Sequence, residues 1–75
     1  MGYRDRITAS HDIMLGKPVI KGTRITVELI LRKLADGATT ADLMAMYPHL
    51  QEADVLAALS YAADVLATEE VIAVV

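Results

Sequence analysis

The spacing of apolar residues separates an irregular first third of this chain from a helical remainder. No helical repeat runs through the first third, and short pieces with β propensity lie at residues 6–8 and 19–20. Turn-forming residues interrupt this segment at Gly16, Pro18 and Gly22. Because a lone hairpin is marginal in water, we predict a β arm over residues 1–25 that packs on the helices or on a second subunit.

The first helix of the remainder is predicted to begin at Thr26 and to end at Gly37. The Thr26 hydroxyl can accept hydrogen bonds from the first free N–H groups, and Glu28 lies favourably in the first turn. Gly37 tolerates the left-handed conformation that often follows a last helical turn. The apolar residues between these ends have the spacing of one buried stripe, which comprises Val27, Ile30, Leu31 and Leu34.

Two further helices are predicted downstream. The second begins at Thr39 or Thr40, since Thr39 with Asp42 resembles a capping box, and it ends before Pro48. The third runs over about residues 51–68, and its apolar arc is wider than one packing surface requires, so part of it is expected to contact another chain. The residues that share one face of this helix are Val55, Leu59, Ala62 and Leu66.

The order of these elements predicts a single, mainly α domain over residues 1–75. It consists of a short N-terminal β arm or hairpin over residues 1–25, a tri-helical body over residues 26–68, and a C-terminal tail over residues 69–75. The last two helices with the turn between them have the layout of a helix-turn-helix, in which the final helix is the recognition element. A plain three-helix bundle is the alternative.

Composition indicates that this chain associates with another molecule. Hydrophobic residues make up 55% of only 75 positions, and there is no cysteine to form a stabilising disulfide. A core this small leaves apolar surface over, so we expect a homodimer or a permanent partner. The residues expected at such an interface are Ile7, Val19, Ile20, Tyr61 and Val65.

Charge is segregated along the chain. The net charge is −3, yet all seven Lys and Arg residues lie within the first 33 positions, and seven acidic residues lie after them. Such a split favours a basic side that meets phosphates or an acidic protein, although a solvated surface without a partner has the same pattern. The residues predicted to bind nucleic acid are Arg4, Arg6, Lys17, Lys21, Arg24 and Gln51.

The start of the third helix argues against DNA. A recognition helix presents Arg, Lys, Asn or Gln to base edges near its N-terminus. Here Gln51 is followed by Glu52 and then by Asp54, and phosphates would repel both carboxylates. DNA binding would therefore depend on the basic arm.

No pattern predicts an enzyme, a metal site or a cofactor. His11 and His49 lie 38 positions apart, the acidic residues have no metal-binding spacing, and no glycine segment has the spacing of a P-loop. The apolar runs are shorter than the ~20 residues of a membrane span, and the polar N-terminus does not resemble a signal peptide. We therefore expect a cytoplasmic protein with no catalytic residue, metal, cofactor, small-molecule substrate or membrane contact.

A known family shares a set of motifs with this chain. The motifs are Gly-x-Pro-x-Ile-x-Gly-Thr-Arg-Ile, a Gly after the first helix, Tyr-Pro-x-Leu, and Ala-Leu-x-Tyr-Ala in the last helix. On these motifs the chain resembles the small prokaryotic proteins called domain of unknown function 433, over roughly residues 6–66. The matching residues are Gly16, Pro18, Ile20, Gly22, Thr23, Arg24, Ile25, Gly37, Tyr47, Pro48, Leu50, Ala58, Leu59, Tyr61 and Ala62.

The resemblance implies an N-terminal β arm, a homeodomain-like tri-helical body and dimerisation. Some members look like VapB-type antitoxins, which are encoded beside a PIN-like ribonuclease toxin, neutralise it and repress their own operon. We therefore expect a dimeric, antitoxin-like component of a type II toxin–antitoxin system that binds a PIN-like toxin, with double-stranded operator DNA as a further partner. The alternative is a protein–protein interaction module with the same fold and no DNA-binding activity.

Two departures from the family pattern bear on mechanism. Gln51 stands where Thr or Ser usually begins the last helix, and the chain ends at Val75 without the long disordered tail that many antitoxins wrap around a toxin. A folded surface or a basic side chain would then have to block the acidic, metal-binding active site of a PIN-type toxin. The candidates for this basic finger are Arg4, Arg6 and Arg24.

Overall fold

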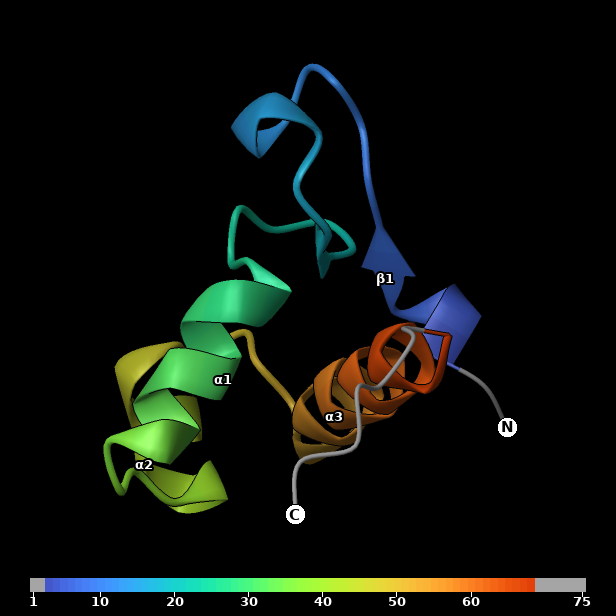
Figure 1. Cartoon of the computed structure of the whole chain (residues 1–75). Helices are drawn as coiled ribbons and strands as arrows, with labels where there is room; N and C mark the ends of the chain where they lie inside the picture. The colour runs from blue at the N-terminus through green and yellow to red at the C-terminus, as the bar shows by residue number, and fades with distance from the viewer. Residues whose placement is uncertain (1–2, 69–75) are drawn as a thin grey trace, which may run out of the picture.

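Three helices and a short N-terminal hairpin make up residues 3–68, the part of the chain that this computed structural model describes (Figure 1). The helices are α1 (Val27–Ala35), α2 (Thr40–Met46) and α3 (Glu52–Ala67). The strands are β1 (Ile7–Thr8) and β2 (Val19–Ile20), and single 3-10 turns lie at Tyr3–Asp5 and Met14–Gly16. The predicted mainly α fold is therefore confirmed, whereas the tail predicted over residues 69–75 lies outside the described residues.

The helix boundaries follow the capping residues that the sequence offers. The Thr26 side chain accepts a hydrogen bond from the Leu29 N–H at 3.0 Å, so α1 begins after its predicted cap. Thr39 and Asp42 each accept a hydrogen bond from the other's backbone N–H, at 3.0 and 2.9 Å, which completes the predicted capping box of α2. Gly37 has a φ of +100° just after α1, so it has the positive φ that was predicted for the residue after the last helical turn.

The hairpin is short and depends on the helices for its position. β1 and β2 pair antiparallel, with Ile7 opposite Ile20 and Thr8 opposite Val19. Two residues per strand are too few for an isolated hairpin to be stable. An isolated bridge joins Val19 to Thr26 at the start of α1, so β2 is attached to the helical body. The connection between the two strands projects away from the helices (Figure 1).

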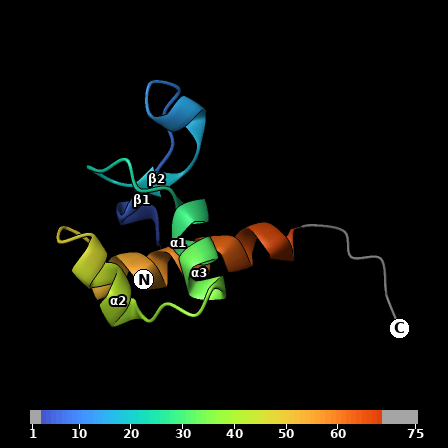
Figure 2. The ribbon, with the colours of Figure 1, turned by 90° about the vertical axis from the view of Figure 1, so that its left-hand side faces the viewer.

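The core lies where β2 meets all three helices. Figure 2 shows α3 lying lengthwise under the hairpin, with α1 crossing it and α2 near its first turns. Ile30 and Leu43, from α1 and α2, are completely buried. The buried apolar side chains form a single cluster, which comprises Ile20, Val27, Ile30, Leu43, Leu50, Val55 and Ala58.

Only part of the wide apolar arc of α3 faces the core. Val55 is buried, but Leu59 and Leu66, which the spacing places on the same face, are 44% and 61% exposed. Asp54 and Ala57 turn inward instead. The helix is apolar on more than one side, and its periodicity alone could not decide which stripe would face the core.

Acidification should weaken the capping box of α2. Hydrogen bonds from the Thr39 backbone N–H and the Thr39 side chain hold the pKa of Asp42 below its usual value. A depressed folded-state pKa stabilises the fold above the unfolded-state pKa of about 4, and this stabilisation is lost as the pH falls through the lower folded value. We predict that Asp42→Asn reduces the fall in Tm between about pH 5 and pH 3, measured by circular dichroism.

Asp64→Asn is the matched control for this change. It removes the same charge from an exposed helical position without touching a cap. If the two variants show the same pH dependence of Tm, the capping box does not carry the effect.

Candidate functional site

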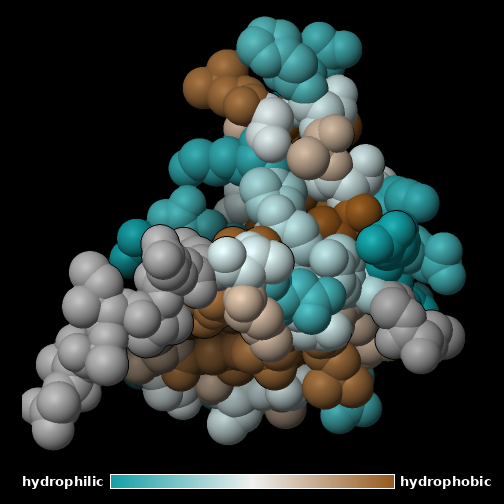
Figure 3. Space-filling view, turned by 45° about the vertical axis from the view of Figure 1, so that its right-hand side comes forward, coloured by the Kyte–Doolittle hydropathy of each residue, from teal (hydrophilic) through white to brown (hydrophobic). Residues whose placement is uncertain are grey.

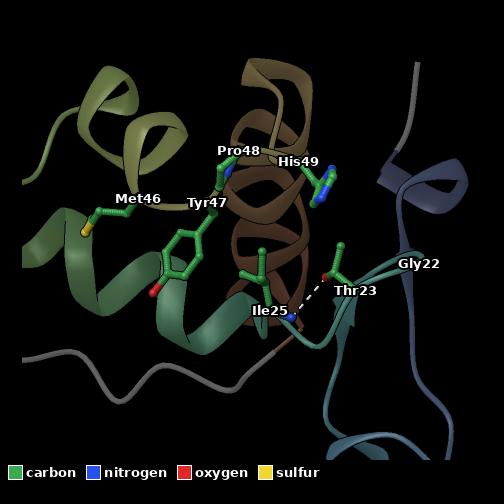
Figure 4. Close-up of a pocket in the computed structure, with 7 residues that line it drawn as sticks. All are labelled: Gly22, Thr23, Ile25, Met46, Tyr47, Pro48 and His49. Atoms are coloured by element: carbon green, nitrogen blue, oxygen red, sulfur yellow. Dashed lines mark hydrogen bonds between the residues drawn. The ribbon is translucent and has the colours of Figure 1, made fainter.

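Two segments far apart in the sequence lie together around one pocket. Gly22, Thr23 and Ile25 come from the connection between β2 and α1, and residues 46–49 come from the end of α2 and the turn after it (Figure 4). The pocket they line has a volume of about 260 Å³. The Gly-Thr-Arg-Ile and Tyr-Pro-x-Leu motifs therefore contribute to one surface.

A second, polar pocket of about 250 Å³ adjoins the first, since the two share Thr23 and His49. Its walls carry charges of both signs. The lining residues are Asp5, Arg6, Ile20, Lys21, Thr23, His49, Gln51 and Asp54. Arg24, which is exposed, lies between the lining residues Thr23 and Ile25 in the sequence. We call the surface made by the two pockets and Arg24 the motif surface.

The turn from Ile20 to Ile25 is held by the hydroxyl of Thr23. This hydroxyl donates a hydrogen bond to the Ile20 carbonyl at 2.8 Å and accepts one from the Ile25 N–H at 2.9 Å. Gly22 has a φ of +82°, which side chains other than glycine rarely adopt. Both motif residues therefore shape the backbone, and the single hydroxyl proton of Thr23 is already engaged.

Arg24 is an exposed cation presented by this turn. It stands between Thr23 and Ile25, which are both half-buried. None of the three ion pairs formed among residues 3–68 involves it. A guanidinium on a backbone fixed in this way is suited to two-pronged binding of a carboxylate or a phosphate.

The opposite wall of the first pocket is anchored by Leu50. Its N–H donates to the Tyr47 carbonyl at 2.8 Å, and its side chain is buried in the core. Tyr47 packs against the same core, whereas Pro48 and His49 are exposed. The Tyr-Pro-x-Leu motif is thus an anchored turn with an exposed apex, whose polar group is His49.

Arg6 and Asp54 form a partly buried ion pair at the polar pocket. Arg6 Nη1 lies 2.9 Å from Asp54 Oδ1, and the two side chains are 34% and 8% exposed. The other carboxylate oxygen accepts a hydrogen bond from the Gln51 N–H at 2.9 Å, and the Gln51 side chain accepts one from Arg6 at 3.3 Å. The predicted phosphate-binding Arg6 and the predicted phosphate-repelling Asp54 therefore neutralise each other.

The remaining predicted cations differ in their surroundings. Lys17 Nζ lies 3.2 Å from Glu28, whose carboxylate also binds Arg32 at 3.0 Å. These hydrogen bonds, with Arg32 the stronger cause, hold the pKa of Glu28 below its usual value. All three side chains are exposed, so the pairs add little stability. Arg4 and Lys21, like Arg24, form no ion pair within the described part of the chain.

Three of the residues predicted at an interface belong to the hairpin. Val19 and Ile20 are 0% and 3% exposed within one protomer, so their side chains lie in the core, where a second chain cannot reach them. Ile7 is half-buried against the same core. The sequence shows only that these residues are apolar, and the packing of β2 against the helices shows what covers them.

An apolar groove of about 330 Å³ contains the other two predicted interface residues. Tyr61 and Val65 line it from α3, and Val27 and Leu31 line it from α1. The Tyr61 ring also packs edge-on against Tyr3, with centroids 5.2 Å apart and planes at 88°. Tyr61 and Val65 therefore lie at an open apolar surface, unlike the residues of β2.

Sequence reasoning missed an exposed row of leucines on α3. Leu56, Leu59 and Leu66 are 59%, 44% and 61% exposed. In the space-filling view a band of apolar surface crosses the lower half of the molecule (Figure 3). The available signal was the excess width of the apolar arc, which indicated a second contact, but on this helix the sequence singled out Tyr61 and Val65 and none of the leucines.

Among residues 3–68, no group of three or more His, Cys, Asp or Glu side chains is placed to hold a metal ion. None of the helices in that range has the length and apolar character needed to cross a membrane. The motif surface instead combines exposed cations with an apolar pocket, an arrangement common at protein interfaces.

Comparison with known proteins identifies similar sequences and one similar fold. A family model described as Protein of unknown function (DUF433) matches residues 7–62. A crystal structure of a DUF433 member protein from Anabaena variabilis ATCC 29413 has 30% sequence identity and a TM-score of 0.78. The match covers 81% of this chain and 60% of that one, so this chain spans about three fifths of the length of its structural relative. No curated protein matches.

Removing the Arg6–Asp54 pair should loosen the arm from α3. Arg6→Ala and Asp54→Asn should each lower the free energy of unfolding by about 1–3 kcal/mol, because each leaves a partly buried polar group without its partner. The loss of unfolding free energy in the double variant should be smaller than the sum of the two single losses by about 1 kcal/mol. This coupling is small because Arg6 stays one-third exposed and solvent screens the pair. Urea unfolding of all four proteins measures this coupling.

Arg4→Ala provides the control, since it removes an exposed cation from the same segment and should change stability by less than about 0.5 kcal/mol. Strictly additive effects of Arg6→Ala and Asp54→Asn would mean that the pair contributes nothing beyond its separate parts.

Proposed function

We propose that this chain, which belongs to the DUF433 family, is a non-catalytic binding protein of the antitoxin type. In this proposal it acts in the cytoplasm as a dimer and neutralises a PIN-like ribonuclease toxin by placing a folded surface over the acidic active site. The observation that carries the proposal is the motif surface, where the exposed Arg24 stands beside an apolar and a polar pocket.

Among the three candidate basic fingers, Arg24 is favoured by its surroundings. Arg6 is held 2.9 Å from Asp54, and its departure would leave a carboxylate that is only 8% exposed without a cationic partner. Arg4 is exposed, but it lies in a single 3-10 turn, a short element that holds the backbone less firmly than the turn before α1 does. The backbone at Arg24 is fixed by both hydrogen bonds of the Thr23 hydroxyl, so less conformational freedom is lost when it binds.

The first pocket would supply the apolar part of the contact. Its lining includes Ile25, Met46, Tyr47 and Pro48. Met46 is 46% exposed there, so apolar surface is available beside the cation. A toxin segment that brings a carboxylate to Arg24 would bury an apolar side chain in this pocket, which follows the usual division between an apolar centre and a polar rim.

Replacing Arg24 should weaken neutralisation without unfolding the protein. Arg24→Ala removes a two-pronged contact to a carboxylate, so half-inhibition of the ribonuclease should require at least ~10-fold more protein, or about 1.4 kcal/mol of binding free energy. The measurement is RNA cleavage by a purified PIN-like ribonuclease, the partner class named in the proposal, titrated with each variant.

Two further variants sharpen this test. Arg32→Ala removes an equal charge from a side chain that is 75% exposed and paired with Glu28, and it should leave inhibition unchanged. Arg24→Lys keeps the charge but loses the planar fork, so it should give an intermediate loss. Full inhibition by the Arg24→Ala protein at wild-type concentrations would contradict the proposed contact.

Operator DNA is a second candidate partner, and one observation favours it. Lys21 and Arg24 leave the same turn, Lys21 shares a pocket with Gln51, and neither cation forms an ion pair within residues 3–68. The ion pair of Asp54 removes one of the two carboxylates expected to repel phosphate, although Glu52 remains exposed. Binding of two copies to one site would double the number of available cations.

If these cations contact phosphates, binding to the chain's own promoter should depend steeply on salt. The logarithm of affinity should fall by about 0.9 per logarithmic unit of salt for each phosphate neutralised, so the double variant K21A/R24A should reduce the slope by about 1.8 per protomer. Fluorescence anisotropy with a duplex of the upstream region measures the slope, and Arg32→Ala should leave it unchanged. Absence of binding by the wild type at low salt would leave protein–protein interaction as the function.

A further inference from the structure

The outer face of α3 carries a stripe of apolar residues with regular spacing. Leu56, Leu59 and Leu66 are 59%, 44% and 61% exposed, and Ala63 in the same row is exposed as well. The intervals of three, four and three residues are those of the seam of a coiled coil. We call these four residues the leucine stripe.

We propose that the leucine stripe pairs antiparallel with the leucine stripe of a second copy of this chain. The inference rests on the dimer included in the proposed function and locates its interface on α3, away from the hairpin residues first expected there. It is independent of whether the dimer binds a toxin or DNA.

Antiparallel pairing matches large side chains with small ones. When the two-fold axis passes beside position 61, Leu56 faces Leu66 of the second copy, and Leu59 faces Ala63 of the second copy. The two-fold symmetry repeats each of these contacts on the other side of the axis. The central leucine–alanine layers let the helices approach closely, and the outer leucine–leucine layers close the two ends. Parallel pairing would place Ala63 opposite its own copy and leave a gap in the seam.

The residues beside the stripe permit this close approach. They are uncharged and no larger than valine: Val55, Ser60, Ala62 and Ala67. The exposed Glu52 lies one turn before Leu56, at the end of the seam. In the antiparallel arrangement the two copies of Glu52 lie about 27 Å apart along the axis, whereas parallel pairing would bring these like charges side by side.

The size of the contact sets the expected affinity. α3 has 16 residues and is therefore about 24 Å long. A pair of such helices buries less than the ~800 Å² per partner of a standard interface, so the dimer should dissociate in the micromolar range. Self-association must then be measured across that range of concentrations.

Sedimentation equilibrium of the full chain tests the pairing. The wild-type mass should rise with concentration from 8.1 kDa towards twice that value. Leu56→Glu places a carboxylate in both outer layers and should weaken the dimer at least ~10-fold. Leu15→Glu is the matched control, because it makes the same change at a leucine that is 86% exposed in the hairpin connection, and it should leave association unchanged.

A charge-reversal rescue tests the orientation. In the double variant L56E/L66K the introduced carboxylate and the introduced ammonium group face each other between antiparallel copies, so most of the association lost in Leu56→Glu should return. The same variant in a parallel pair would oppose like charges and remain monomeric. The two positions are about 15 Å apart along one helix, so the rescue cannot arise within a single chain.

Three results would overturn the inference. The first is a wild-type mass of 8.1 kDa at all concentrations, and association that appears only after deletion of residues 69–75 would then identify that segment as the occupant. The second is unchanged association of Leu56→Glu, and the third is a folded L56E/L66K protein that stays monomeric. Circular dichroism checks folding, and Leu66→Lys, in the last turn of α3, replaces Leu56→Glu if that variant unfolds.

The failure of this inference is distinguishable from the failure of the proposed function. A monomeric Leu56→Glu protein that still inhibits the toxin would leave the proposed function in place. A stable dimer that binds neither the toxin nor DNA would support the pairing of the leucine stripe and contradict the proposed function.

Discussion

A partly buried ion pair between Arg6 and Asp54 is the contact on which the arrangement of the motif surface depends. It joins the segment before β1 to the first turn of α3, across 48 positions of sequence. The same carboxylate accepts the Gln51 N–H, so the anchor of the arm is also the cap of the helix. The Lys21 N–H in turn donates to the Arg6 carbonyl at 2.7 Å, which fixes the turn that carries Arg24.

This ion pair changes the meaning of the segregated charge in the sequence. A segment of 33 residues that holds every Lys and Arg, followed by an acidic remainder, first indicates two oppositely charged sides that are available to partners. In the folded chain some of the cations are neutralised internally. Asp54 of the acidic remainder pairs with Arg6, and Glu28, within the basic segment itself, pairs with Lys17 and Arg32. The cations left for a partner are consequently fewer, and those on the turn before α1 lie beside an apolar pocket. A mixed surface of this kind suits an acidic protein better than it suits an extended phosphate backbone.

The small size of the domain explains why α3 has so much apolar surface outside the core. The core needs only one face of this helix, through residues such as Val55 and Ala58, because the hairpin and two short helices cover no more. Leu56 and Leu59 therefore remain at the surface with the spacing of a helix-pairing seam. Association, as proposed for the leucine stripe, would add burial that a chain of this length cannot obtain alone.

Short-range features were predictable from the sequence because the groups that form them lie within one helical turn. The Thr26 cap and the reciprocal Thr39–Asp42 capping box each require only the backbone three residues away, and Pro48 ends α2 through its own ring. The motifs also identified the two segments that later proved to share a pocket. The pairing of Arg6 with Asp54, the burial of Val19 and the exposure of Leu59 were not accessible in this way. They depend on which elements come together across the fold, and a helix that is apolar on several sides carries no local signal for the side that will be covered.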